Sequence, residues 1–511
     1  MEKMDQTNHT REEAVLRAVA YHATQSHEAS EEYLLPDYMP AVRRVISVQA
    51  TVLPETRFLN GKALEFGGTL AYSILYIGDG GEIYCAPLTS EYSASVSLGE
   101  NAAVDAAAFG IDTTVENVSC RVTAPRRMTV KCRLRSQITY LHPRSVADKL
   151  QEGTGARLTT ADELAVERLI EEADDTVLSR GELTASVGGT LSDAGKVIAC
   201  RGAVRVEETT AEEGCVKVRG DVLLHVIFLS PDGKYVASEA KAPFSESVTV
   251  PGAVLGSPSR AWGRAASVSV TPGEEGCTWE IEFDLEAECA QPCKCAYTAD
   301  LFSTDCASET VTAETDSLCL LRCGQGALTV SGEGGRQSKA LPEETVLDAY
   351  ASCAAERLEV QKGKLCLTGT CTVTTLILQD GDIVSEETVL PLKYEWDVPA
   401  SPDGGELLWR CSTDPVSVSV RAEGEKLNIH ADAALSICAM QRGRIRFVES
   451  AVLNKSARRK SDDGCIRVCY PDAGEPLWEI AKRYGVSRQT IRMENGLPEG
   501  ETVSDGAPIL L

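Results

Sequence analysis

The segment GTLAYSILYIGDGGEI, residues 68–83, decides the fold. Its large side chains recur two residues apart, as a half-buried strand requires, at Leu70, Tyr72, Ile74 and Tyr76. Asp79-Gly80 then supplies the positive φ that a tight hairpin turn needs. We therefore predict a strand that ends in a hairpin turn.

The same pattern occurs twice more along the chain. GDVLLHVIFLSPDGKY begins at Gly220 and GTCTVTTLILQDGDI begins at Gly369, so the three starting glycines are 152 and 149 residues apart. The matching faces consist of Val222, Leu224, Val226 and Phe228, and of Cys371, Val373, Thr375 and Ile377. A repeat of about 150 residues is long enough for one domain, so we predict three related β-domains in tandem.

Two further blocks recur with the same period. An aromatic residue precedes a valine by four in YSASV (92–96), FSESV (244–248) and YEWDV (394–398). Alternating strands follow in VSCRV (118–122), ASVSV (266–270) and VSVSV (416–420). Many short strands with frequent turns favour sandwiches. The predicted fold class is mainly β: three tandem β-sandwich-like repeat domains plus a small α+β module.

The expected domain boundaries follow from these blocks. We predict a flexible or helical N-terminal segment at 1–32, β-domains at 33–145, 176–300 and 301–454, a charged linker at 455–464 and a terminal module at 465–511. A helical connector is expected at 146–175, because Thr160 and Glu163 resemble a capping box. Its apolar stripe consists of Ala165, Val166, Leu169 and Ile170.

The terminal module has the pattern strand, helix, helix, strand (βααβ). Ile466, Val468 and Tyr470 alternate as a strand. Pro476 stands at the start of a helix whose apolar stripe is Leu477, Ile480, Ala481 and Tyr484. Gly485 ends this helix, Ser487 caps a second one that closes at Asn495-Gly496, and residues 508–511 form the last strand. Trp478, Ile480 and Tyr484 are its expected core.

CIRVCYPDAGEPLWEIAKRYGVSRQTIRMENGL, residues 465–497, resembles the LysM domain, a family that binds N-acetylglucosamine-containing glycans. The resemblance implies a binding groove formed by Gly474, Glu475, Pro476, Leu477, Asn495, Gly496 and Leu497. Glu475-Pro476 stands where the family has Asp-Thr. Proline offers no N–H and the threonine hydroxyl is missing, so we expect glycan binding to be weak.

YLLPDYMPAVRRVISVQATV, residues 33–52, resembles the Leu-Pro-x-x-x-Pro segment of SPOCS domains, which occur in bacterial spore-coat proteins. Repeated SPOCS domains followed by a LysM domain resemble clostridial spore-morphogenetic proteins. This resemblance implies a non-enzymatic scaffold in the mother-cell cytoplasm. It would dock coat components to the basement-layer ATPase at the forespore surface, with LysM as a protein-binding module. The alternative is a peptidoglycan-binding cell-wall protein, and a third hypothesis is an enzyme with an unfamiliar site.

The remaining features favour or disfavour broad classes. A net charge of −26 disfavours nucleic-acid partners, and it indicates either solubility or a basic partner surface. The first residues lack the apolar stretch of a secretory signal, and no stretch of about 18 apolar residues predicts a membrane span. We predict no catalytic residue, metal or cofactor. For one cysteine group, structural zinc, redox cross-linking and reduced packed thiols all remain open: Cys289, Cys293, Cys295, Cys306, Cys319 and Cys323.

Overall fold

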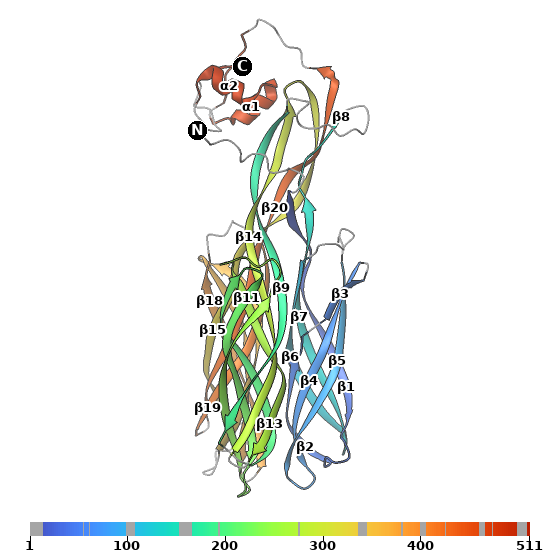
Figure 1. Ribbon diagram of the computed structural model, residues 1–511, viewed down its shortest axis with the longest axis vertical. Coiled ribbons are helices and arrows are strands. Elements are labelled where there is room, and N and C mark those ends of the chain that lie inside the picture. The colour runs from blue at the N-terminus through green and yellow to red at the C-terminus, as the bar shows by residue number, and fades with distance from the viewer. Residues whose placement is uncertain are drawn as a thin grey trace.

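The computed structural model describes residues 14–54, 56–60, 62–98, 108–152, 166–192, 195–273, 276–335, 345–379, 382–398, 405–424, 426–458, 466–472, 474–497 and 508–511. It is almost entirely antiparallel sheet, as predicted. Three β-sandwiches stand side by side at one end of the molecule, and long strands carry a small helical head at the other (Figure 1).

Each repeat is a sandwich of two sheets built from the same strand order. The first strand and the last two strands make one sheet, and the strands between them make the other. In repeat 1 the first sheet contains β1 (Val15–Leu34), β6 (Ala108–Ala124) and β7 (Arg127–Ser145). The second contains β2 (Val42–Val52), β3 (Thr56–Asn60), β4 (Ala63–Gly78) and β5 (Ile83–Ser97).

Repeats 2 and 3 follow the same plan. In repeat 2 the first sheet contains β9 (Val166–Leu191), β13 (Ser259–Gly273) and β14 (Gly276–Ser303). The second sheet contains β10 (Lys196–Glu212), β11 (Cys215–Leu229) and β12 (Tyr235–Thr249). In repeat 3 the first sheet contains β15 (Cys306–Gly335), β19 (Glu406–Glu423) and β20 (Lys426–Arg458). The second sheet contains β16 (Thr345–Gln361), β17 (Lys364–Gln379) and β18 (Asp382–Asp397). The short β8 (Lys149–Glu152) runs parallel to β20.

The side chains predicted to share one face of each hairpin strand form the sandwich cores. Leu70, Ile74 and Tyr76 are fully buried in the first core, and Tyr72 is nearly so. The equivalent side chains of β11 and β17 are also buried, in the cores of their own repeats. These burials confirm the predicted strand faces in all three repeats.

Two expected helical segments are strands. Residues 15–32, placed in a flexible or helical N-terminal segment, belong to β1, which pairs with β7 along its length. Residues 166–175, placed in a helical connector, begin β9, while the capping-box residues Thr160 and Glu163 lie outside the described residues. The first strand of each sandwich pairs with the last strand of the repeat, which is distant in sequence. Local patterns therefore did not indicate it. Residues 455–458 of the expected linker likewise end β20.

The second sheets of the three repeats also meet one another. In each, a β-bulge falls at the same position and places Ile46, Ile198 or Leu347 between paired neighbours. A bulge redirects a side chain, and these three point away from their own sandwich cores into a shared apolar cluster. Leu75, Ile227 and Leu376 join them. The strands are buried on both faces here, which explains their continuous apolar runs.

The three sandwiches close into a ring. Polar contacts join repeat 1 to repeat 2, repeat 2 to repeat 3, and repeat 3 back to repeat 1. They are Tyr235 Oη with the Ile83 amide at 3.3 Å, Arg201 with Asp348, and Arg44 Nη2 with Asp382 Oδ1 at 2.8 Å. We call the three sandwiches the ring.

Repeats 2 and 3 extend beyond the ring as a stalk, which we define as residues 149–152, 166–178, 290–303, 306–322 and 439–458. Its strands have a separate core that includes Ala173, Tyr297 and Phe447. Leu150, Leu301 and Val448 continue this core toward the tip. Figure 1 shows the stalk rising from the ring to the head.

The head, residues 466–511, has the predicted order of elements. β21 (Val468–Cys469) pairs with β22 (Ile509–Leu510), and α1 (Leu477–Tyr484) and α2 (Arg488–Asn495) lie between them in sequence. Gly485 and Gly496 end the helices in left-handed conformations with φ of 69° and 58°. Pro476 is the N-cap of α1, one position before the expected one. Among the described residues, no helix is long and apolar enough to cross a membrane.

Candidate functional site

The expected groove residues of the head are largely committed to holding the head together. Leu477 is buried in the core beside Trp478 and Ile480. The Glu475 carboxylate pairs with Arg483 and accepts a hydrogen bond of 3.1 Å from the Asp472 amide. On this side of the expected groove, Gly474 and the ring of Pro476 are exposed, and Pro476 has no N–H to donate.

The opposite side of the expected groove is also occupied. The Asn495 side-chain amide donates to the Leu510 carbonyl at 2.7 Å, and its oxygen accepts from the Leu510 amide at 2.7 Å. Asn495 thus anchors the final strand to α2. Gly496 is exposed and Leu497 is half-buried against the head core. Glycan binding by these residues remains a prediction.

Other apolar side chains of the head are more accessible: Met493 of α2, which is 75% exposed, and four residues at the first and last strands. Ile466, Val468 and Tyr470 alternate on the outer face of the first strand and are 84%, 46% and 75% exposed. Leu510, which pairs with Val468, is 41% exposed on the neighbouring strand. We call these four residues the outer face of the head. The sequence pattern predicted the strand but did not indicate which of its faces is exposed.

A carboxylate of the stalk anchors α1 of the head. Asp300, near the end of β14, accepts hydrogen bonds from Trp478 Nε1 at 2.8 Å and from Lys482 Nζ at 2.5 Å. Burial opposes ionisation of Asp300, but these two donors outweigh it and lower its pKa. The Phe302 ring packs edge-on against the Trp478 indole, with centroids 5.1 Å apart.

A second contact holds α2 on the same support. Arg488 donates to the Arg168 carbonyl at 2.8 Å, and its guanidinium lies 5.0 Å from the Trp478 ring centroid. Trp478 therefore joins three things: the head core, the tip of β14 and the Arg488 side chain. Its role as a core residue was predicted, and its contact with the stalk was not.

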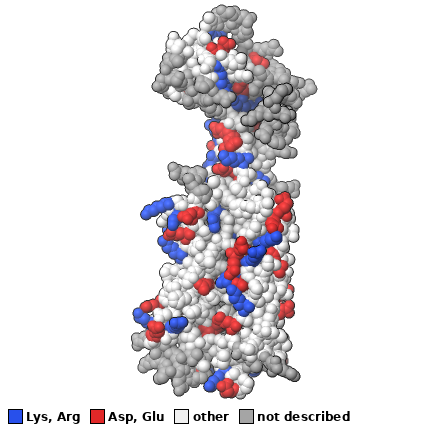
Figure 2. Space-filling view, turned by 60° about the vertical axis from the view of Figure 1, so that its left-hand side comes forward, with Lys and Arg blue, Asp and Glu red and all other residues white. Residues whose placement is uncertain are grey.

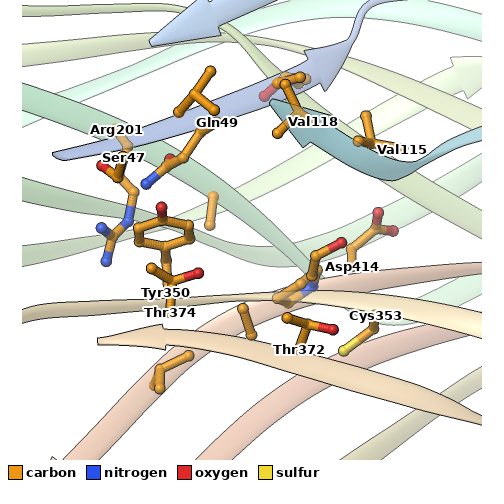
Figure 3. A pocket seen from close by; sticks show the side chains of 18 of the residues that line it. Ser47, Gln49, Val115, Val118, Arg201, Tyr350, Cys353, Thr372, Thr374 and Asp414 are labelled. Atoms are coloured by element: carbon orange, nitrogen blue, oxygen red, sulfur yellow. The ribbon is translucent and has the colours of Figure 1, made fainter. Parts of the chain in front are cut away.

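A cavity of about 540 Å³ lies in the middle of the ring and is lined by strands of all three repeats (Figure 3). At one side Gln49, Arg201 and Tyr350 come from equivalent positions, with the 152- and 149-residue spacing of the repeat. Arg201 donates to Asp348 and to the Ala349 carbonyl, and lies 5.5 Å from the Tyr350 ring centroid.

Asp414 lies on the opposite side of the cavity (Figure 3). Burial raises its pKa to about 6, and this effect exceeds that of Arg264, which acts in the other direction. Its carboxylate accepts a hydrogen bond from Ser412 at 3.0 Å. The cavity histidine, His225, is paired with Glu239 at 3.1 Å and is not positioned beside a hydroxyl or thiol nucleophile by any described contact.

A buried ion cluster lies between the cavity and the stalk. Arg260 and Arg410, from equivalent positions of β13 and β19, both contact Asp112 and Glu288. The equivalent position of β6 is Gly110, and a Cβ there would overlap the Arg410 guanidinium. Repeat 1 therefore has a glycine at this position, because the Arg410 side chain occupies the space that a side chain there would need.

The charges of this cluster balance. Arg180 adds a third cation and pairs with Glu286, and Trp262 lies between the Arg180 and Arg260 guanidinium groups at 4.6 and 4.5 Å. Burial opposes ionisation of Glu288, yet Arg410 and Arg260 lower its pKa to about 2. The carboxylates and arginines therefore neutralise one another, and the arrangement joins all three repeats.

The six cysteines considered for metal or redox chemistry do not converge. Cys289, Cys293 and Cys295 lie along β14, whereas Cys319 and Cys323 lie along β15. Among the residues that the structure describes, no group of three or more His, Cys, Asp or Glu side chains is arranged to hold a metal ion. The described cysteines are free thiols.

Residues 193–271 match the family model described as SipL, SPOCS domain. This stretch of repeat 2 is similar to a SPOCS domain. The matched residues contain β10 to β13 of repeat 2, and the strands β9 and β14 that complete this sandwich lie outside the match. Repeats 1 and 3 share the strand order of the SPOCS repeat. Neither the curated proteins nor the solved structures that were compared contain a match.

The sequence did not indicate the residues that join the repeats. Asp112, Glu288 and Arg410 are ordinary charged residues in alternating strands, and the pairing appears only when the ring closes. One signal was present: Arg260 and Arg410 interrupt strands at equivalent positions of two repeats. A charged residue repeated at one position of a core-facing strand indicates a buried partner.

Proposed function

We propose that the chain is a non-enzymatic scaffold of spore-envelope assembly, in which the ring and the head bind different partners. One observation carries this proposal. The ring is closed on itself by ion pairs and apolar packing, while the stalk holds the head apart from it (Figure 1). Two separated surfaces on one rigid chain are suited to bridging two proteins.

The SPOCS match supports a role in sporulation, because SPOCS domains occur in coat proteins. On that basis we propose that the protein acts at the developing forespore surface, in the mother-cell cytoplasm, and docks coat components to the basement-layer ATPase. The head would bind the ATPase as a LysM-type protein-binding module. Its outer face supplies the apolar contact area that protein interfaces use at their centre.

The charge on one face of the molecule does not favour a single basic partner. On the face seen in Figure 2, acidic and basic side chains are interspersed over the ring and the stalk. A mixed surface of this kind does not attract one sign of charge strongly. The net charge of −26 therefore supports solubility more than a basic partner.

The test uses the full chain and the purified basement-layer ATPase. We expect Ile466→Ser combined with Tyr470→Ser to reduce capture of the ATPase by at least about tenfold, since apolar anchors carry most of the binding energy of an interface. The matched control is Phe58→Ser, which alters a 55%-exposed side chain of the ring. Equal capture by the head variant and the wild type would refute the role of the head.

Glycan binding is the alternative that the same protein can test. The commitment of Glu475 and Asn495 to contacts within the head counts against it. We expect little retention on insoluble peptidoglycan or chitin. Strong retention that is lost on replacing Gly496 with a bulky residue would favour a cell-wall protein over a scaffold.

A further inference from the structure

Two pairs of buried cysteines face each other across neighbouring strands of repeat 3. Cys353 of β16 lies directly opposite Cys371 of β17, and Cys323 of β15 lies directly opposite Cys438 of β20. In each pair the facing thiol raises the pKa of one member, Cys323 or Cys353. All four side chains are buried, with at most 7% of the residue exposed.

The equivalent positions of the other repeats show what these pairs replace. Where repeat 3 has Cys353 and Cys371, repeat 2 pairs Val204 with Val222 and repeat 1 pairs Val52 with Leu70. A single buried cysteine is commonly a small apolar side chain. Here both members of a facing aliphatic pair are cysteines, so the position has gained a chemistry that packing alone does not require.

The second pair also occupies a position where the repeats place interacting groups. Repeat 1 has His22 opposite Thr139, with Nδ1 and Oγ1 3.0 Å apart. Repeat 2 has Arg180 opposite Glu288, both in the buried ion cluster. This position joins the first and last strands of each sandwich. In repeat 3 the side chains available to join them are two thiols.

We propose that Cys353–Cys371 and Cys323–Cys438 are two disulfide-forming sites that cross-link repeat 3 in its folded state. Directly opposite residues of an antiparallel pair have Cα atoms about 4.5 or 5.5 Å apart. A disulfide spans Cα separations of about 4.4–6.8 Å. Both Cα separations lie within this range, and closing the bond then requires the two Cβ atoms to approach to about 3.5–4.5 Å. The proposal is independent of the scaffold function and stands if that function fails.

The reaction needs an oxidant, which we name as a small disulfide such as oxidised glutathione. One cysteine thiolate attacks the small disulfide and releases one glutathione thiolate, giving a mixed disulfide. The facing thiolate then attacks the protein sulfur and releases the second. Two protein thiols and one small disulfide thus become one protein disulfide and two small thiols, which keep the two protons. In the Cys353–Cys371 pair, the facing Cys353 thiol lowers the pKa of Cys371, so we expect Cys371 to attack first.

Burial determines how the oxidant reaches these sites. The thiols become accessible only when the strands separate locally, so oxidation is slow compared with that of half-buried cysteines such as Cys215 and Cys366. Once formed, each bond restricts the unfolded chain, and the Cys323–Cys438 bond closes much the longer loop. It would secure repeat 3 at the base of the stalk.

The test is oxidation of the folded full chain. The protein is held with oxidised glutathione a few degrees below its melting temperature, quenched in acid, alkylated in denaturant and digested without reduction. We expect peptides that link Cys353 to Cys371 and Cys323 to Cys438. The melting temperature of the oxidised protein should rise by about 5–10 °C, and reduction should bring it back to its original value.

Two matched variants keep the test independent of folding. Cys353→Val introduces the residue that repeats 1 and 2 have there, and Cys438→Thr introduces the equivalent residue of repeat 1. Each should remove one linked peptide and leave the other. Alkylation marks the thiols that have stayed reduced. The proposal is overturned if the four buried cysteines are still alkylated when Cys215 and Cys366 have reacted completely with oxidised glutathione. The proposal is also overturned if these cysteines form disulfides with residues other than the facing cysteine. It is overturned equally if they keep glutathione as a stable adduct.

Discussion

Arg410 shows how strongly a single residue of this protein depends on distant parts of the chain. It comes from repeat 3, contacts Asp112 of repeat 1 and Glu288 of repeat 2, and is buried with both. A buried charge is tolerated only when it is paired, and removing one partner leaves the others desolvated without compensation.

Arg410→Met should therefore destabilise the protein by roughly 3–5 kcal/mol, because Asp112 and Glu288 lose a cation that no water replaces. Chemical denaturation at pH 7.5 measures this. The control is Arg219→Met, which removes a 67%-exposed side chain that lies 3.8 Å from Glu208 and should change stability by less than about 0.5 kcal/mol. Equal effects of the two variants would show that the cluster is hydrated.

Asp414 gives the opposite prediction for a carboxylate. Because its pKa is raised to about 6, the folded protein holds a proton that the unfolded chain has released, and stability falls as pH rises from about 4 to about 7. Asp414→Asn should remove this component and stabilise the protein at pH 7.5 by roughly 1–2 kcal/mol. Melting between pH 4.5 and 7.5 measures it, with exposed Glu309→Gln as the control. A variant with an unchanged pH profile would rule out titration of Asp414.

At the scale of the element, the sequence predicted the hairpin strands well and the first strand of each sandwich poorly. Leu70 and its alternating neighbours carry their signal within a few residues, because one face of the strand is buried in its own sandwich. Val166, Leu169 and Ile170 have helical spacing, yet they belong to β9. Leu169 packs against the head and Ile170 is exposed, so their spacing reflects two different neighbours and not one helical face.

The head was predicted more completely than any repeat. Its caps are local: Ser487 accepts from the Thr490 amide at 3.0 Å, and Gly485 needs the left-handed conformation that glycine favours. The groove was inferred from a family resemblance and could not anticipate that Asn495 binds Leu510. The attachment to Asp300 involves residues 178 apart and leaves no local pattern.

Asp300→Ala should loosen the head without affecting the ring. The substitution removes the acceptor for both Trp478 and Lys482, at a cost of roughly 1–3 kcal/mol to the attachment. Hydrogen exchange should increase in residues 466–497 and at the tips of β9 and β14, and stay unchanged in the ring. Glu479→Ala, on the exposed side of α1, is the control. Unchanged hydrogen exchange in the head would mean that its other contacts with the stalk are enough to hold it in place without Asp300.

At the scale of the molecule, we expect the three repeats to unfold as one cooperative body. The apolar cluster contains a bulge residue from each repeat, so each sandwich completes its burial only in the presence of the other two. The sequence predicted three repeats in tandem but did not predict that they pack against one another. The bulges that turn Ile46, Ile198 and Leu347 toward one another are single-residue irregularities, and a strict alternation pattern hides them.

Ile198→Ala should consequently destabilise all three repeats, by roughly 2–4 kcal/mol. Hydrogen exchange near the unfolding midpoint should accelerate together in β4, β11 and β17, and not in β11 alone. Val236→Ala, at a 42%-exposed site of the same repeat, should have little effect. Faster exchange confined to repeat 2 would show that the sandwiches unfold independently.

The stalk extends from one end of the ring only, and this gives the molecule a direction. The exposed hairpin turn at Pro231 to Lys234 closes the opposite end, where Gly233 has a φ of 82°. A fluorophore placed in that turn and another in the head would mark the two poles. Their heights above a coated surface would then reveal whether an anchored molecule stands upright or lies flat, which no binding assay distinguishes.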